Sequence, residues 1–195
     1  MAFDFSGSAA MVQSGGSLTD LSIFSEAADL NVIIDSIAAM DIIDKENIFL
    51  FGHSMGGLVS SYIGCMRPDE IRGMILIEPS FQLKDAVMAD YPDLDAIPDV
   101  MYTPDFLGKI YFVDLYSLNI YDLLPAFAND VIIFSATDEY SIGGLYPEYL
   151  PRAAEIFPSA ELITVEGADH QFQGEAGERM MEFSLAFLAR QMNQP

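Results

Sequence analysis

The segment IFLFGHSMGG, residues 48–57, constrains the fold more than any other stretch of this chain. Four apolar residues run directly into Ser54, which stands between Gly52 and Gly56. A G-x-S-x-G frame between a strand and a helix is typical of a nucleophile elbow, in which the serine sits at a strained tip and a helix leaves at once. We expect both glycines where a β-carbon would collide with a neighbouring strand or helix, although a glycine-rich turn with an incidental serine would look the same.

The remaining pattern predicts an α/β fold. Short apolar runs alternate with longer stretches of helical period, which indicates a mostly parallel sheet flanked by helices. Strands are expected at residues 2–5, 48–51, 74–77, 131–134 and 161–165. Helices are expected at residues 22–40, from Leu58 to near Pro68, at 146–157 and at 177–191, the last with Met181, Leu185 and Leu188 on its apolar side.

Residues 80–130 interrupt this alternation. The stretch is dense in Pro, Asp and Tyr and holds only short apolar clusters, so we interpret it as a lid or cap insertion within a single domain of residues 1–195. Its aromatic residues could line a substrate pocket or hold an irregular insertion onto the core, and the sequence leaves both interpretations open.

Charge and composition exclude several classes of partner. The 30 acidic and 8 basic residues give a formal charge of −22, which repels nucleic acid and anionic lipid surfaces. No apolar run approaches the roughly 18 residues of a membrane-spanning helix, and no basic and apolar leader opens the chain. We therefore expect a cytoplasmic protein without a membrane or nucleic-acid partner. The one cysteine, Cys65, is expected to be a small buried thiol.

A serine nucleophile needs a base and a third group that orients the base. The chain has two histidines, His53 and His170. His53 precedes Ser54 on the same strand, so its side chain should point away from that of Ser54 and pack beside the elbow. His170 lies in a loop after the last expected strand, where it can reach back over the sheet. We therefore predict His170 as the base.

The acid should lie at the carboxyl end of a strand, because an open α/β sheet gathers its site along that edge. Asp138 follows the expected strand at 131–134 and is the first candidate. Its neighbour Glu139 is expected to be solvated. Glu78, at the end of the strand at 74–77, is the second candidate, and Asp169 is interpreted as a turn-forming residue.

The order Ser54, Asp138, His170 is that of the α/β-hydrolase triad. The chain resembles the α/β hydrolases, and more narrowly the bacterial cinnamoyl (feruloyl) esterases, over nearly its whole length. The matching segments are FDFSG at 3–7, SIFSEAADL at 22–30, IFLFGHSMGG at 48–57, QLKDA at 82–86, LGKIY at 107–111 and GADHQF at 167–172. The resemblance implies that the insertion covers the site and that Asp85 and Tyr111 contact the phenolic ring of the substrate.

The resemblance also implies about three further strands before the FDFSG segment, one of them followed by a His-Gly loop that supplies an oxyanion-hole amide. We therefore expect an N-terminally truncated fold. The backbone N–H of Met55 can still bind a tetrahedral oxyanion, but loss of the second donor costs on the order of 10²–10³ in rate. A gap in the sheet would also leave backbone groups unpaired.

Two hypotheses follow. The first is a serine carboxylesterase that needs no cofactor or metal and acts on a small aromatic or short acyl ester. In it Ser54 attacks, His170 relays the proton, Asp138 orients His170 and Met55 N–H binds the oxyanion. The alternative is a truncated, non-catalytic hydrolase-like protein, stabilised by a partner or by homodimerisation.

Overall fold

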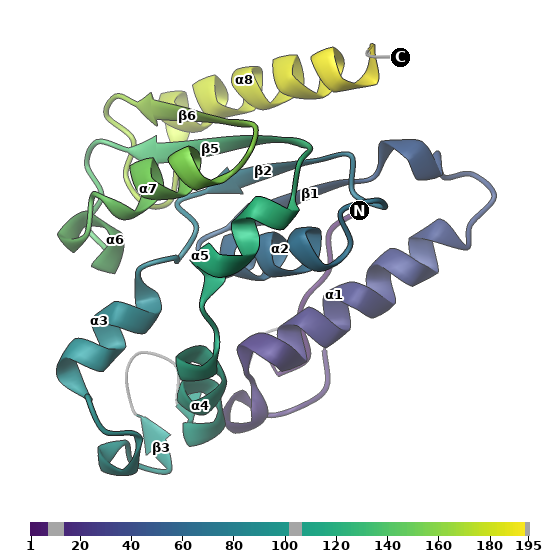
Figure 1. Ribbon diagram of the computed structural model, residues 1–195. Coiled ribbons are helices and arrows are strands. Elements are labelled where there is room, and N and C mark those ends of the chain that lie inside the picture. Colours follow the sequence, from purple (N-terminus) through teal and green to yellow (C-terminus); the bar gives the residue numbers. More distant parts are fainter. Residues whose placement is uncertain (8–13, 102–106, 194–195) are drawn as a thin grey trace. The chain divides into compact units, whose positions relative to one another are not determined.

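The computed structural model describes residues 1–7, 14–101 and 107–193 (Figure 1). The chain forms two compact units. The first consists of Met1–Ile43 and Lys84–Asn119, and the second of Asp44–Leu83 and Ile120–Pro195. The chain therefore leaves the second unit once and returns to it.

A parallel sheet of four strands organises the second unit. Its strands, in the spatial order β1-β2-β5-β6, are β1 (Phe49–His53), β2 (Gly73–Ile77), β5 (Asp130–Ala136) and β6 (Ala160–Val165). In the register, His53 lies opposite Ile77, which lies opposite Phe134. Because all four strands are parallel, the loops after their carboxyl ends gather at one edge of the sheet.

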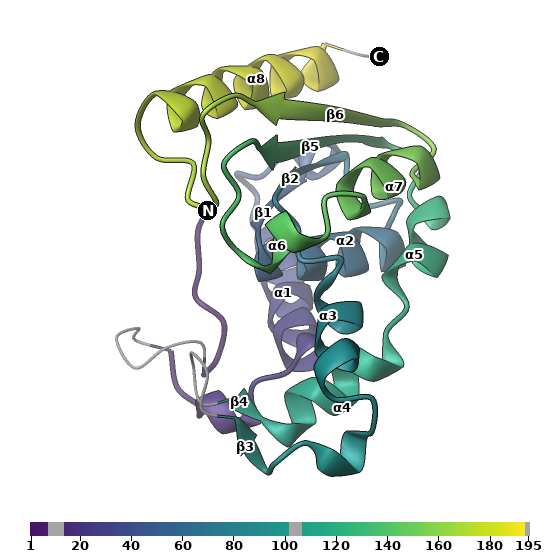
Figure 2. The same cartoon turned by 90° about the vertical axis from the view of Figure 1, so that its left-hand side faces the viewer.

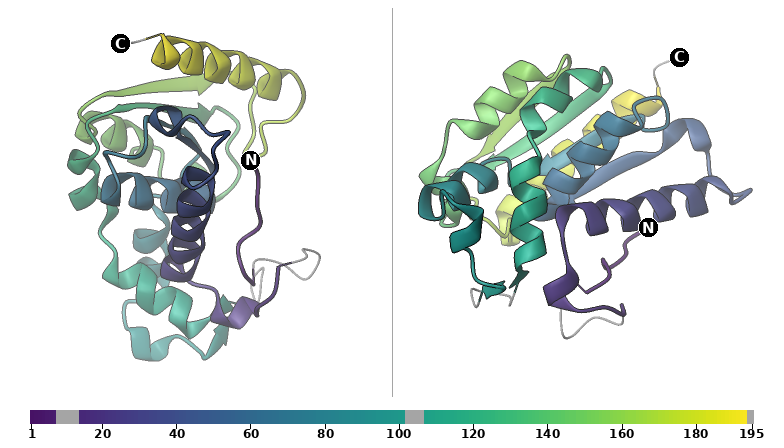
Figure 3. Two further views of the ribbon diagram at one scale, coloured as in Figure 1. Left: turned by 90° about the vertical axis from the view of Figure 1, so that its right-hand side faces the viewer. Right: turned by 60° about the horizontal axis from the view of Figure 1, so that its bottom comes forward.

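Helices cover both faces of this sheet. The second unit contains the helices α2 (Met55–Met66), α5 (Ile120–Leu123), α6 (Ile142–Leu145), α7 (Tyr149–Ile156) and α8 (Gly174–Met192), with short 3₁₀ turns η2 (Lys45–Asn47) and η4 (Leu124–Ala126). In Figures 1 and 2, α8 lies on one face of the sheet, against β5 and β6. On the other face, α2 lies against β1 and β2, and α7 lies against β5 and β6. The two views of Figure 3 show the same separation of α8 from α2 and α7.

Burial explains why the central strands are continuous apolar runs. Every residue of β2 is buried, and β5 is buried at Val131 through Phe134, because helices cover both faces. Between the sheet and α8 lies one apolar cluster, which includes Ile75, Ile132, Phe134, Met180 and Phe187. This core holds the strands in the register that determines which loops meet.

The first unit is mainly helical. Its elements are η1 (Leu18–Asp20), α1 (Ile23–Ala38), α3 (Leu83–Asp90, which begins at the unit boundary), η3 (Leu94–Ala96), the antiparallel pair β3 (Val100–Met101) and β4 (Leu107–Gly108), and α4 (Lys109–Ser117). A capping box starts α1: Ser22 Oγ accepts from Ser25 N–H at 3.1 Å, and Ser22 N–H donates to Ser25 Oγ at 2.8 Å. Helix α1 packs on α4 (Figure 1).

The predicted α/β class is confirmed, and the strands expected from residue 48 onward are found within two residues at each end. Two expectations are wrong. Residues 2–5 form no strand; instead the rings of Phe3 and Phe5 pack edge to face, 5.0 Å apart. In α8 the face turned to the sheet carries Met180 and Phe187, whereas Met181 and Leu185 are 44% and 58% exposed. Of the three residues expected on the apolar side, Leu188 alone packs, partly buried, against the core.

None of the described helices is long and apolar enough to cross a bilayer.

Candidate active site

Ser54 occupies the strained tip that the sequence predicts. It follows β1 directly and has a φ of +54° and a ψ of −116°, a conformation that non-glycine residues rarely adopt. Backbone hydrogen bonds hold it there: Ser54 N–H donates to Ile77 O at 2.8 Å, and Ser54 O accepts from Gly57 N–H at 3.0 Å and Ser80 N–H at 3.1 Å. Strain of this kind persists only where several contacts over-determine it, and it concentrates at functional sites.

Close packing around this turn explains two glycines but not the third. A β-carbon on Gly52 would lie 2.3 Å from Gly56 O, and one on Gly57 would lie 2.8 Å from Pro79 Cβ. A β-carbon on Gly56 would meet nothing within 4 Å, so the expected collision at Gly56 is wrong. Met55, the expected oxyanion donor, is the first residue of α2, whose N-terminus carries a partial positive charge.

The hydroxyl of Ser54 has a serine as its neighbour. Ser54 Oγ lies 3.3 Å from Ser80 Oγ, and either group can donate. Among the described residues, no hydrogen bond joins Ser54 to His170, although catalytic hydrogen bonds are often longer in a free enzyme than in its substrate complex. The sequence held no signal for the contact with Ser80.

His170 lies in the loop after β6 and pairs with a carboxylate. Its Nδ1 is 2.8 Å from Glu139 Oε2, and both side chains are largely buried, 14% and 6% exposed. A neutral imidazole that donates from Nδ1 keeps Nε2 as an unprotonated acceptor. The arrangement therefore prepares Nε2 of His170 to take a proton.

Hydrogen bonds keep Glu139 ionised. Burial by itself raises the pKa of this carboxyl, but hydrogen bonds from the side chain and backbone of Ser141 and from His170 outweigh burial and lower it. The N–H of Ser141 donates to Glu139 Oε1 at 2.5 Å. A carboxylate with these partners can orient the ring of His170 and stabilise its protonated form.

Asp138, the predicted acid, does not contact His170. Its side chain is exposed, its Oδ1 accepts from Thr137 Oγ1 at 3.4 Å, and its N–H donates to Ala168 O at 2.8 Å. Strand β5 continues to Ala136, two residues beyond the expected end, so Glu139 and not Asp138 reaches the ring. The expectation that Glu139 is solvated is wrong for the same reason.

Glu78, the second candidate acid, lies nearby but bonds elsewhere. It is buried, has a φ of +41°, and accepts the backbone N–H of Ala136. Burial, together with the charge of Glu139, raises the pKa of Glu78 against the lowering effect of the Ala136 hydrogen bond. Glu78 and Glu139 both line a cavity of about 150 Å³ beside the loop that follows β5.

His53 does more than pack beside the elbow. Its Nε2 lies 2.7 Å from the carbonyl oxygen of His170, and the two rings are 4.8 Å apart between centroids. Asp169 forms the turn expected of it, since its Oδ1 accepts from Gln171 N–H at 2.9 Å.

The two residues expected to contact a substrate belong to the first unit. Asp85 lies in the first turn of α3 and its side chain is exposed. Tyr111 lies on α4 and is 4% exposed; burial, and then the charge of Glu26, raise the pKa of its hydroxyl well above the ordinary value. Ser54, Glu139 and His170 belong to the second unit.

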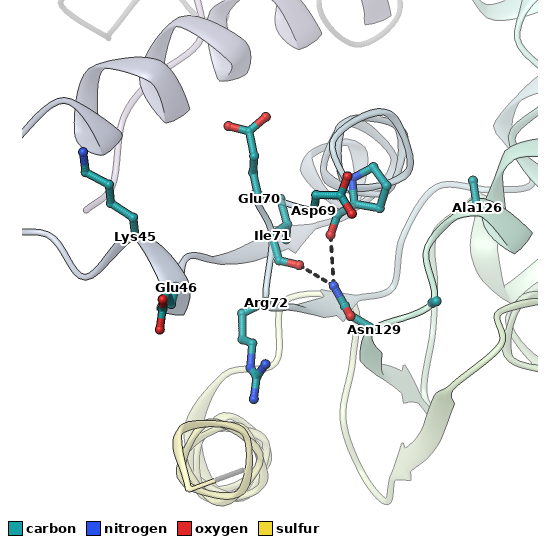
Figure 4. A pocket seen from close by; sticks show the side chains of 10 residues that line it. Lys45, Glu46, Asp69, Glu70, Ile71, Arg72, Ala126 and Asn129 are labelled. Carbon is teal, nitrogen blue, oxygen red and sulfur yellow. Dashed lines mark hydrogen bonds between the residues drawn. The ribbon is translucent and has the colours of Figure 1, made fainter. Parts of the chain in front are cut away.

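A larger pocket at the opposite edge of the sheet lacks this chemistry. Its volume is about 380 Å³, and it lies beside the amino ends of β2 and β5 (Figure 4). The side-chain amide of Asn129 donates there to the carbonyl oxygens of Pro68 and Ile71 at 3.0 and 2.8 Å. Its lining mixes Lys45 with acidic side chains and contains no serine–histidine pair. Within the described part of the chain, no group of three or more His, Cys, Asp or Glu residues could hold a metal ion.

Comparison with known proteins shows the family and the fold of the chain. Residues 1–104 match the hydrolase family described as serine aminopeptidase, S33. No curated protein matches the chain.

Solved structures that resemble the chain are α/β hydrolases. Est1E from Butyrivibrio proteoclasticus with bound ferulic acid matches with a TM-score of 0.81 and 20% identity, over 95% of this chain and 76% of that one. A structure described under LipS and LipT, two metagenome-derived lipolytic enzymes, matches with a TM-score of 0.73 and 16% identity, over 95% of this chain and 80% of that one. Monoacylglycerol lipase from Paleococcus ferrophilus matches with a TM-score of 0.64 and 20% identity, over 91% of this chain and 79% of that one. At these identities the likeness shows the α/β-hydrolase fold.

Proposed function

Since the chain belongs to the hydrolase family described as serine aminopeptidase, S33, we propose that it hydrolyses carboxylic esters through an acyl-enzyme on Ser54. One observation carries the proposal. A serine in a strained turn between a strand and a helix shares a sheet edge with a histidine whose Nδ1 is bonded to a buried carboxylate. This combination of nucleophile, base and orienting acid is the one that acyl transfer requires.

In the proposed mechanism, Nε2 of His170 takes the proton of Ser54 Oγ as that oxygen attacks the ester carbonyl. Glu139 holds the Nδ1 proton and stabilises the imidazolium that forms. The Met55 N–H, at the positive end of α2, binds the oxyanion. His170 then protonates the leaving alcohol, and a water activated by the same imidazole releases the acid and restores Ser54.

The proposed substrate is a small aromatic or short acyl ester. Support comes from the resemblance to feruloyl esterases, in which Asp85 and Tyr111 match positions that contact the phenolic ring, and from the ferulic acid bound to Est1E. We include in the proposal that Asp85 and Tyr111 contact the substrate. The non-catalytic alternative has no comparable support, because the family match is to hydrolases.

The test is hydrolysis of four substrates by the purified chain: p-nitrophenyl acetate, methyl ferulate, p-nitrophenyl palmitate and alanine p-nitroanilide. We expect turnover of the first two, and labelling of Ser54 by a fluorophosphonate located by peptide mass. Ser54→Ala should lose both the ester hydrolysis and the labelling, while Ser117→Ala, on the surface of α4, should keep both activities. The proposal is contradicted if the chain melts cooperatively but neither hydrolyses these esters nor reacts with the fluorophosphonate. Faster hydrolysis of the anilide than of the esters would assign peptide substrates instead.

A further inference from the structure

The loop that carries His170 must cross the sheet edge to approach Ser54. It follows β6, whereas Ser54 follows β1, and two strands, β2 and β5, separate them in the sheet. On the β5 side, Asp138 N–H donates to Ala168 O and Gly167 N–H donates to Thr137 Oγ1, each at 2.8 Å, and the His170 ring contacts Glu139, also at 2.8 Å. These bonds hold the loop to the residues of β5 and the loop after it, and none of them reaches β1.

His53 supplies the connection to β1. It is the last residue of that strand, directly before Ser54, and its Nε2 lies 2.7 Å from the carbonyl oxygen of His170. The two residues are 117 positions apart in the sequence, so the hydrogen bond joins distant segments. This hydrogen bond therefore ties the His170 backbone to the end of β1, directly before Ser54.

The chemistry of the acceptor determines the state of the His53 ring. A carbonyl oxygen can only accept, so Nε2 of His53 carries a proton. Burial lowers the pKa of His53, against the hydrogen bond to the His170 backbone, which raises it. A positive charge on His170 lowers this pKa further, and the negative charge of Glu139 raises it. The ring is therefore neutral near pH 7, with its proton on Nε2 and none on Nδ1.

We propose that His53 is a positioning residue that holds the backbone of His170, and through it the catalytic imidazole, at the distance from Ser54 that proton transfer needs. Its effect on turnover rests on the proposed function. Misplacement of a catalytic group by about 1 Å costs on the order of 10²-fold in rate. Loss of the His53 donor should therefore lower kcat and leave the binding of substrate nearly unchanged.

Two substitutions separate the donor from the bulk of the ring. His53→Gln keeps an N–H donor close to the position of Nε2, and His53→Leu removes it. We expect His53→Leu to lower kcat for p-nitrophenyl acetate by about 10- to 100-fold with KM changed less than about twofold, and His53→Gln to recover most of the loss. Tyr140→Leu is the matched control, because Tyr140 also lies against the His170 ring, 6.2 Å between centroids, without holding its backbone.

A spectroscopic arm does not depend on activity. The chain has two histidines, so the ¹⁵N-imidazole spectrum contains two ring systems and is assigned with His53→Gln. At pH 7.5 the His53 ring should be neutral and protonated on Nε2, and hydrogen exchange across residues 166–172 should be faster in His53→Leu than in the wild type. The tautomer is measured in the wild type and only its assignment uses His53→Gln, so this arm still decides the question if His53→Leu does not fold.

The outcomes distinguish this proposal from the proposed function. If the wild type is inactive but shows the expected tautomer and exchange pattern, the proposed esterase function is contradicted, while the role of His53 in holding the loop is supported. An active wild type in which His53 is protonated on Nδ1, or in which His53→Leu matches Tyr140→Leu in kcat, overturns the positioning role.

Discussion

Glu139 Oε2 lies 2.8 Å from Nδ1 of His170, and this contact joins the loop after β5 to the loop after β6. The carboxylate is buried with the ring, so water competes weakly for either partner. The pairing orients the imidazole with Nε2 available as acceptor.

The first prediction separates two adjacent acids. Glu139→Gln keeps the shape of the side chain but favours the wrong histidine tautomer, so kcat should fall by on the order of 10³–10⁴. Asp138→Asn should stay within a few-fold of the wild type, because Asp138 is exposed and does not contact His170. The measurement is kcat for p-nitrophenyl acetate in both variants, and the reverse ranking would restore Asp138 as the acid.

The second prediction concerns Glu78, which bonds to Ala136 N–H and not to the histidine. Glu78→Gln keeps an acceptor for that N–H, so kcat should remain within about threefold of the wild type. Glu78→Ala leaves the N–H buried without an acceptor, which should lower the free energy of unfolding by about 1–3 kcal/mol. Steady-state kinetics and urea denaturation of the pair test this, and a collapse of kcat in Glu78→Gln would assign Glu78 a part in the chemistry.

The third prediction uses the two glycines that flank the elbow. In Gly52→Ala the new methyl would lie 2.3 Å from Gly56 O and 2.6 Å from Ser60 Oγ, so the free energy of unfolding should fall by about 1–3 kcal/mol. In Gly56→Ala nothing lies within 4 Å, and alanine favours a helix over glycine by about 0.5–1 kcal/mol, so stability should hold or rise. Thermal melts by circular dichroism compare the two, and equal losses would contradict the close packing of Gly52 and the open space beside Gly56.

The fourth prediction is a pH dependence of stability that arises in the first unit. Burial, and then the charge of Asp29, raise the pKa of Glu26 from 4.5 to about 7. The unfolded chain loses this proton first, so stability should fall as pH rises from about 4.5 through about 7, and the cost is complete above that range. At one pKa unit per 1.36 kcal/mol, Glu26→Gln should gain on the order of 3 kcal/mol at pH 8.

The same gain should shrink as the pH approaches 4.5, where both states bind the proton. Urea denaturation of Glu26→Gln at pH 8 and pH 5.5 measures this difference. Glu178→Gln, on the exposed side of α8, is the control and should show no such trend. A gain of equal size at both pH values would mean that the carboxyl is not the cause.

Much of the sheet edge could be predicted from the sequence, because short apolar runs and the glycine frame around Ser54 determine strands and a turn locally. The acid could not. The end of β5 decides which residue of the following loop faces His170, and a strand that continues two residues past Phe134 moves the contact from Asp138 to Glu139. Apolar periodicity does not show where a strand ends when its last residues, Ser135 and Ala136, are small.

The prediction of the buried face of α8 was wrong for a related reason. The helix carries two apolar stripes one residue apart, one through Met180 and Phe187 and one through Met181 and Leu185, and both have helical spacing. Only the packing of Phe187 in the cluster with Ile75 and Ile132 decides which stripe is buried. Likewise the contact of His53 with His170 depends on tertiary structure that no local pattern encodes.

The chain leaves the second unit at Leu83 and re-enters it at Ile120, so residues 84–119 form one continuous segment between two points of the second unit. The strands whose register brings Glu139 to His170 all lie outside residues 84–119. Under the proposed function, variation in this stretch would change Asp85 and Tyr111, the residues proposed to contact the substrate, and would leave Ser54, Glu139 and His170 in the sequence. Grafting a foreign segment between Leu83 and Ile120 would therefore alter the proposed substrate contacts without replacing any strand of the four-stranded sheet.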